Sequence, residues 1–453
     1  MLKLHPLIPA AAVALCAASI FAWFAGPGLA GGFMPDDLMN LHRSARTPAL
    51  DFLRGTFSPW AGEWRPFGFL IFKGLYTAFG FHPLPYHVLA LGLLVVNALL
   101  LAVLAWRLTG SGAVTAFTAL LICHHGYFSD LYLNSGTMFD TLAAVICLAL
   151  IHSHLSQPRP GAARLLLQLL SFLLALQIKE IAIFVPVALW GHEILIRRDR
   201  QAWRTAHQAW AYSGLACLFA AGLLWSGGEV MANPEYRPSL TPALLLQHWG
   251  HYLANMFYQA ADPGPVITLA IFGAATAAAW LARTPAALWA WLLAFSAPLP
   301  LLAVTPRSFY AFYVPYLFWA LLAGILLARL TERWRWAPAA LFVLLGVWLV
   351  NRHLWIQPYA EQWHRDATRE MQPALSFIPS EARAWPRGAS ILFHKDPYPQ
   401  DDYTLLYVAT LSTGDLTLAI HRTKTGASPA SHADFHYQLS SERLTRLPAP
   451  PSP

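Results

Sequence analysis

Apolar residues gather in blocks of around 20 along this chain, and the short polar segments between them carry most of the charge. A helix of about 20 apolar residues spans the ~30 Å hydrocarbon core of a bilayer. The pattern therefore predicts an all-α polytopic membrane protein with about 11 transmembrane helices. We expect these helices near residues 7–27, 83–106, 112–129, 137–155, 163–179, 180–196, 208–226, 264–282, 286–304, 309–328 and 337–356. No turn sequence marks the boundary between the fifth and the sixth.

Three polar segments are longer than simple turns, at 28–82, 227–263 and 357–453. The first two contain amphipathic, aromatic-rich stretches, at 66–81 and 243–258. Such stretches predict helices that lie in the membrane interface, because aromatic side chains favour the depth of the headgroups.

The C-terminal segment shows a different pattern. Within it, "GASILFHKDP" and "GDLTLAIHRTK" predict strands, whereas 364–378 and 402–412 predict helices. We therefore expect a transmembrane domain over 1–356 and a small extramembrane α/β domain over 357–453. The proline-rich end, "RLPAPPSP", predicts disorder.

Composition agrees with a membrane protein, since 57% of the residues are hydrophobic and only 12% are charged. Soluble proteins average about 45–50% apolar and about 25% charged residues. The four cysteines all fall inside apolar blocks, which predicts buried apolar side chains rather than disulfides or a zinc site. The formal net charge is +7, but the basic residues lie in short loops, so the charge requires no nucleic-acid partner.

Basic residues are unevenly divided between the two sides of the predicted bundle. With the N-terminus inside, the cytoplasmic side collects Lys3, Arg107, Arg159, Arg164, Arg197, Arg198, Arg200, Arg204, Arg283, Arg329, Arg333 and Arg335. The opposite short loops contain mainly Arg307. The positive-inside rule therefore places the N-terminus in the cytoplasm. We expect a bacterial inner-membrane protein whose C-terminal domain lies in the periplasm.

Ionisable residues gather on the predicted external face, in or beside the ends of the helices. They are Asp36, Asp37, Asp130, Asp140, Lys179, Glu180 and Arg307, with His124 and His125 about one turn before Asp130. Ionisable groups at membrane depth are costly, so each invites a functional hypothesis. By contrast, the histidines near the cytoplasmic side are expected to be structural: His152, His154 and His192.

The external residues suit group transfer from a lipid phosphate. A carboxylate can deprotonate an acceptor hydroxyl as it attacks, and a fixed Arg or Lys can stabilise the leaving phosphate. Structural alternatives stay open. The Asp36–Asp37 pair or Asp140 could cap a helix, and Lys179 could form an ion pair with Glu180.

Four short motifs carry a family resemblance: "PDDLMNLHR", "HGYFSDLYLNSGTMFDTLA", "LQIKEIAIF" and "PRSFYAFYVPY". Their order, spacing and common membrane side resemble those of the glycosyltransferase C (GT-C) superfamily. The likeness is greatest to bacterial relatives of protein O-mannosyltransferases, the family-39 type. In the second motif the chain departs from the family, because Gly126, Phe128 and Met138 replace a proline, a histidine and an arginine.

The resemblance implies an inverting glycosyltransferase with an external active site. Asp36 would be the general base, and Asp37 would orient it or the acceptor. The donor phosphate would be held by Lys179, Arg307 and Glu180, with support from Asp130, Asp140, His125, Arg65 and Tyr310. The expected partners are the bilayer, a polyprenyl-phosphate-linked hexose or pentose, and a protein, lipid or glycan acceptor. No metal or other cofactor is expected, although clustered carboxylates could bind a divalent ion.

Two other classes of function compete with this one. An O-antigen-ligase or polymerase-type envelope enzyme would use Arg237, His248 and His251 in the 227–263 segment. A transporter would place charged or helix-breaking residues near the middle of the membrane, whereas here the charges gather at one face.

Overall fold

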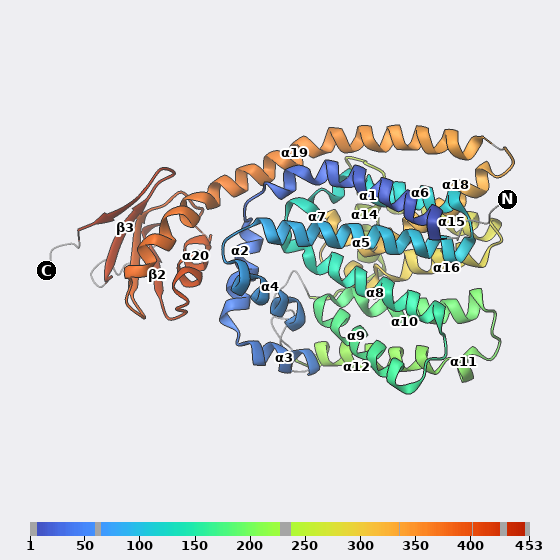
Figure 1. Cartoon of the computed structure of the whole chain (residues 1–453), viewed down its shortest axis with the longest axis horizontal. Helices are drawn as coiled ribbons and strands as arrows, with labels where there is room; N and C mark the ends of the chain where they lie inside the picture. The colour runs from blue at the N-terminus through green and yellow to red at the C-terminus, as the bar shows by residue number, and fades with distance from the viewer. Residues whose placement is uncertain are drawn as a thin grey trace.

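The computed structural model describes residues 7–58, 65–226, 237–334, 336–400, 402–425 and 433–448. Its long helices lie side by side in one bundle, and a small sheet stands beyond one end of that bundle (Figure 1). A single helix, α19 (Ala337–Glu381), runs along the bundle and continues to the sheet. The predicted all-α membrane protein with a small C-terminal α/β unit is confirmed.

Each predicted transmembrane segment contains a helix of the bundle. In chain order these helices are α1 (Leu7–Leu29), α5 (Leu84–Thr109), α6 (Gly112–Cys123), α8 (Met138–Ser156), α9 (Ala162–Ile178), α10 (Val185–Gly191), α12 (His207–Ser226), α15 (Pro265–Leu281), α16 (Pro285–Ser296), α18 (Tyr313–Thr331) and α19. Among the described residues, six helical segments are by themselves long and apolar enough to cross a membrane. They are Leu84–Thr109, Ser135–Ser156, His207–Ser226, Pro285–Leu302, Phe309–Thr331 and Ala337–Ala384.

Shorter helices connect or cover the bundle. The α-helices among them are α2 (Pro35–Arg46), α3 (Ala49–Phe57), α4 (Pro66–Phe79), α7 (Asp130–Leu133), α11 (Ala202–Thr205), α14 (Pro242–Met256) and α17 (Leu299–Leu302). Single turns of 3-10 helix are η1 (Gly126–Phe128), η2 (Ser135–Thr137), η3 (Glu180–Phe184), η6 (Phe309–Phe312), η7 (Ala382–Ala384) and η8 (Thr423–Thr425), and η4 (His192–Ile196) is a π-helix. The two predicted amphipathic stretches form α4 and α14, which bury Phe69 and Trp249 against the protein.

The chain reverses at Lys179, where the sequence shows no turn. Gln168 of α9 donates a hydrogen bond to Ser153 near the end of α8, whereas Lys179 lies beside Asp140 at the start of α8. Helix α9 therefore runs antiparallel to α8, and the following segment returns to the other side. Lys179 has extended backbone angles (φ −153°, ψ 125°), so a single residue breaks the helix.

The C-terminal unit is a four-stranded sheet with the order β2-β1-β3-β4. Its elements are β1 (Ser390–Lys395), α20 (Thr404–Thr413), β2 (Ala419–Arg422), β3 (Phe435–Leu439) and β4 (Leu444–Leu447). Strand β1 is parallel to β2 and β3, and β4 is antiparallel to β3. The two predicted strands match β1 and β2, and the predicted helices fall in α19 and α20. The hairpin of β3 and β4 was not predicted.

One apolar core joins the C-terminal unit to the segment that follows α1. Leu38 of α2 and Phe72 of α4 belong to the same buried cluster as Val408 of α20 and Tyr437 of β3. Helix α20 packs against both α2 and α19. The boundary predicted after residue 356 falls inside α19, so the division of the chain into two domains stays a prediction.

Candidate functional site

Helix α2, which carries the Asp36–Asp37 pair, is held at both ends. Asp37 is fully buried; its carboxylate accepts the backbone N–H of Met34 at 2.8 Å and the hydroxyl of Ser135 at 2.7 Å. Lys73 of α4 donates to carbonyl oxygens at the C-terminal end of α2, including that of Thr47 at 3.1 Å. Burial raises the pKa of the Asp37 carboxyl to about 6, and the two hydrogen bonds oppose that rise. Asp37 therefore fixes the start of α2 against η2.

Asp36 lies beside Asp37 but is exposed. It borders Gly136 of η2, because a Cβ added at that glycine would lie 3.3 Å from the Asp36 Cβ. The side chains of Asn40 and Asn134 approach the same point, at 3.3 and 2.9 Å. Although Asp36 is exposed, this neighbourhood removes part of its hydration and so raises the pKa of its carboxyl. A carboxylate of this kind is accessible and a stronger base than one in water.

Two ion pairs lie where the start of α8 meets the chain reversal at Lys179. The Lys179 Nζ lies 3.0 Å from the Asp140 Oδ2, and Arg65 binds Glu180 through two nitrogens, at 2.6 and 3.1 Å. Successive side chains on extended backbone point to opposite sides, so Lys179 and Glu180 find different partners. The ion pairs of Lys179 and Glu180 in this structure are therefore with Asp140 and with Arg65.

Arg65 takes an unusual backbone conformation to reach Glu180. Its φ is 52° and its ψ 47°, the left-handed region, directly before α4 begins. That conformation costs an L-residue about 1–2 kcal/mol, and the bidentate contact with a carboxylate offsets it. The guanidinium also lies 5.8 Å from the centre of the Phe139 ring.

Tyr310 and Arg307 approach this cluster from the start of α18. The Tyr310 hydroxyl lies within electrostatic reach of Asp36, Asp130, Asp140 and Arg65. The backbone N–H of Arg307 donates to the Tyr252 hydroxyl of α14 at 3.1 Å. The negative charge of Asp140 also interacts electrostatically with the Tyr252 hydroxyl. The structure therefore brings the predicted residues of four distant segments to one place, with Tyr310 among them.

Asp130 is bound by a residue that the sequence did not single out. The Nε2 of His364, in α19, lies 3.0 Å from the Asp130 Oδ1, and its Nδ1 lies 3.3 Å from the Met34 sulfur. Met34 is the residue whose N–H binds Asp37. Helix α19 thus links the Asp130 loop to the start of α2.

His125 lies apart from these charges, in a box of aromatic rings. Its ring stacks on Tyr258 at 4.6 Å and on Phe309 at 4.9 Å between centroids, and it meets Phe128 and Tyr316. Its Nε2 lies 3.1 Å from the carbonyl oxygen of Met256. These contacts join α14 to η1 and α18.

No hydrogen bond or ion pair within the described structure joins the three residues expected for an O-antigen-ligase or polymerase-type enzyme to one another. Two of them lie in α14, and the third precedes that helix. His248 is buried and its Nδ1 lies 2.7 Å from the carbonyl oxygen of Leu302. His251 lies 3.6 Å from the Asp262 carboxylate, and Arg237 is exposed.

Within the described part of the chain, one group of three side chains has the spacing of metal ligands. It consists of His154, His192 and Glu193 and lies at the other end of α8 from Asp140.

Neither protein-family models nor curated protein sequences match this chain. Two solved structures resemble it over nearly the whole length. One is ArnT from Cupriavidus metallidurans bound to undecaprenyl phosphate, with a TM-score of 0.53, 14% identity, and coverage of 95% of this chain and 92% of that one. The other is the same protein in the apo state, with a TM-score of 0.54, 14% identity, and coverage of 94% and 92%. This likeness establishes the fold, which is GT-C-like.

Sequence reasoning missed three residues of the site region. Ser135 and His364 hold the two aspartates Asp37 and Asp130, and Gly136 leaves space beside Asp36. A lone histidine in a polar helix or a serine in a loop gives no sequence signal. Their partners are distant in the chain, so packing alone reveals them.

Proposed function

We propose that this protein is an inverting membrane glycosyltransferase that takes a sugar from a polyprenyl phosphate. The observation that carries the proposal is the accessible carboxylate of Asp36, which shares the neighbour Tyr310 with Asp140 and Arg65 of the two ion pairs. The fold supports it, because ArnT with the same architecture binds undecaprenyl phosphate. Within the GT-C fold, the four motifs favour the family-39-type branch, and the membrane is a bacterial inner membrane with this face in the periplasm.

The reaction would be a single displacement at the anomeric carbon. Asp36 removes the proton of an acceptor hydroxyl while the hydroxyl oxygen bonds to that carbon. The bond between the carbon and the phosphate oxygen breaks, and polyprenyl phosphate leaves with the electron pair. Lys179 and Arg307 would stabilise the negative charge that develops on the phosphate. Attack opposite the leaving group inverts the configuration.

Division of labour between the two aspartates follows from their contacts. Both oxygens of Asp37 already accept hydrogen bonds from Met34 and Ser135, and the side chain is buried. Asp36 is exposed and its pKa is raised, which suits a base that must meet a substrate. Asp37 would position Asp36 through the helix start.

Replacement of Asp36 by asparagine tests the base. In cells that lack the gene, a polyprenyl-phosphate sugar should accumulate, which mass spectrometry of the lipid extract would detect. Wild-type protein should clear it, whereas Asp36→Asn should reduce clearance by roughly 10²–10⁴-fold, the usual contribution of a general base. Asp51→Asn is the matched control, since Asp51 is an exposed aspartate of α3 that pairs with Arg54. Full clearance by Asp36→Asn would remove Asp36 from this role.

Binding of the carrier lipid is tested separately from the chemistry. Undecaprenyl phosphate should raise the melting temperature of the purified wild-type protein in detergent. Arg307→Ala should reduce that shift, while Asp36→Asn should keep it. A protein that undecaprenyl phosphate does not stabilise would contradict the proposed donor class.

A further inference from the structure

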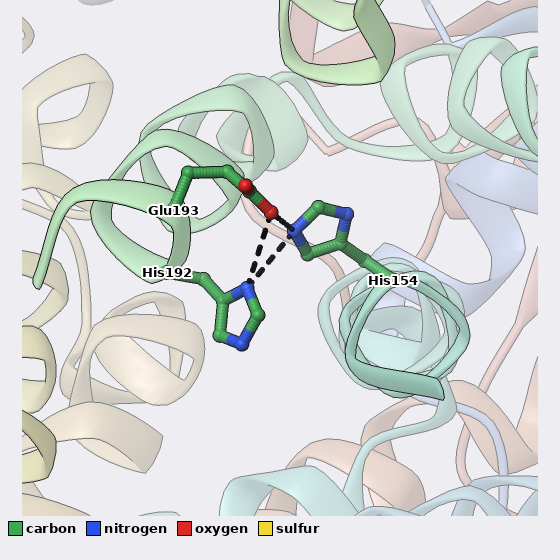
Figure 2. Close-up of side chains that lie close together, drawn as sticks. All are labelled: His154, His192 and Glu193. Carbon is green, nitrogen blue, oxygen red and sulfur yellow. Dashed lines mark hydrogen bonds and ion pairs between the residues drawn. The ribbon is translucent and has the colours of Figure 1, made fainter. Parts of the chain in front are cut away.

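Three buried side chains converge at the end of α8 opposite Asp140. His154 lies in the last turn of α8, and His192 and Glu193 begin the π-helix η4 (Figure 2). The exposed fraction is 1% for His154, 6% for His192 and 2% for Glu193. Figure 2 shows one nitrogen of each ring and one carboxylate oxygen pointing toward a common centre.

The separations of the three atoms match a coordination sphere. The His154 Nε2 lies 3.1 Å from the His192 Nδ1 and 3.1 Å from the Glu193 Oε1, and the last two atoms are 3.5 Å apart. Zinc binds imidazole nitrogen and carboxylate oxygen at about 2.0–2.2 Å in a tetrahedral site. Tetrahedral ligands at those lengths are about 3.3–3.6 Å apart by simple geometry from the same bond lengths. The observed triangle therefore needs little adjustment to hold such an ion.

The tautomer of His154 is set by a chain of amides. Its Nδ1 lies 2.7 Å from the Gln208 Oε1, and the other end of the Gln208 amide donates to Gln168, which donates to Ser153. An amide oxygen only accepts, so the His154 Nδ1 carries the proton. In the neutral ring, Nε2 then presents its lone pair to the centre. Metal-bound histidines commonly donate their second N–H to such an outer partner.

Glu193 brings a second lone pair to the same centre. Its Oε2 accepts a hydrogen bond from Arg197 at 2.6 Å, whereas its Oε1 accepts no well-aligned hydrogen bond and is buried. A carboxylate oxygen that faces an imidazole lone pair at 3.1 Å is repelled unless a cation or a proton lies between them. The position of this buried oxygen, 3.1 Å from His154 Nε2 and 3.5 Å from His192 Nδ1, thus points to a cation or a proton at the centre.

Local backbone shape explains why two adjacent residues both reach this centre. Neighbours on an α-helix diverge around the axis, and the wider π-turn brings them closer together in direction. Such π-turns are rare and frequently lie at functional sites. In η4, the side chains of both His192 and Glu193 are directed toward His154.

We propose that His154 Nε2, His192 Nδ1 and Glu193 Oε1 bind a divalent transition-metal ion, zinc by its fit to two nitrogens and one oxygen. The fourth position would take a water molecule. The ion would tie α8 to η4 at the end of the bundle away from Asp36. This site is independent of the proposed transfer chemistry, and it assigns a role to two histidines that the sequence pattern marks as structural.

Metal binding by the purified full-length protein in detergent tests the site. The protein is first treated with a chelator and then given zinc chloride. Elemental analysis should then find about one more zinc ion per chain in the wild type than in Glu193→Gln. Cobalt(II) should give the visible absorption of a tetrahedral site. His192→Ala and Glu193→Gln should weaken binding by more than the 10–100-fold that loss of an outer partner costs. Gln208→Leu should weaken it within that range.

His152→Gln is the matched control, because His152 lies on the same helix and contacts the Leu100 carbonyl and Arg107 instead. It should keep the zinc equivalent. Zinc should also raise the melting temperature of wild type and of His152→Gln, but not of Glu193→Gln. If wild type binds no more zinc than Glu193→Gln while both elute as folded protein, the metal is excluded and a shared proton holds the cluster.

Discussion

The two ends of α8 carry the two main polar clusters of the bundle, and they balance charge in different ways. At the start of the helix, Asp140 pairs with Lys179, and Glu180 nearby pairs with Arg65. Each carboxylate there has its own cation from the protein. At the other end, one oxygen of Glu193 pairs with Arg197, while its second oxygen converges with two imidazole nitrogens and has no well-aligned donor.

This difference separates two kinds of site. Carboxylates that each pair with a cation of the protein are balanced in charge without a bound ion. Converging lone pairs repel one another and call for a positive ion between them. The function of a polar cluster therefore depends on which side chains contact each other, and not only on which residue types it contains.

The two ends also differ in what covers them. Helix α20 of the C-terminal unit packs against α2, which carries Asp36. His42 of α2 and Tyr407 of α20 have ring centroids 4.8 Å apart. The C-terminal unit therefore packs directly against the helix that carries the proposed base.

Breaking one ion pair at the start of α8 should have the largest effect on stability. Lys179→Met leaves the buried Asp140 carboxylate without its cation, and loss of one partner of a buried pair costs about 3–5 kcal/mol. The double variant Lys179→Met/Asp140→Leu should recover most of that loss. Denaturant unfolding in detergent would measure both. Equal destabilisation in the two variants would show that the pair is not what holds this end together.

A smaller effect is expected from the titration of Asp37. Its folded pKa of about 6 lies above the ordinary aspartate value of 3.8, so the folded state binds this proton more tightly. The resulting stability is complete below pH ~4 and is lost as the pH rises through ~6. The unfolding free energy of wild type relative to Asp37→Asn should therefore fall by about 3 kcal/mol over that range. A difference that is flat with pH would contradict the raised pKa.

The smallest effect should come from one hydrogen bond between α4 and the C-terminal unit. The Tyr76 hydroxyl of α4 donates to the Leu411 carbonyl of α20 at 3.0 Å. Tyr76→Phe removes that bond alone and should cost about 0.5–1.5 kcal/mol. Hydrogen exchange should become faster in α20 and remain unchanged in η4. Equal acceleration at both places would mean that the two ends of the bundle are not independent.

Much of the architecture could be predicted from the sequence because its signal is local. Apolar blocks mark the helices, and the segments 388–397 and 414–424 carry short apolar runs between turn residues. The β3–β4 hairpin was missed because its strands, Phe435–Leu439 and Leu444–Leu447, are short. The break at Lys179 was also hidden, since one extended residue leaves no turn signature.

The sequence alone determined which residues carry charge and that they lie at the ends of the apolar helices. The physical reason is that the middle of such a helix excludes charged side chains, so polar groups remain at its ends. Only the tertiary structure decided the partners: Asp140 for Lys179, His364 for Asp130, and Glu193 for His154. These pairs join residues 39 to 234 positions apart. Their contacts depend on how antiparallel helices pack, which no local pattern encodes.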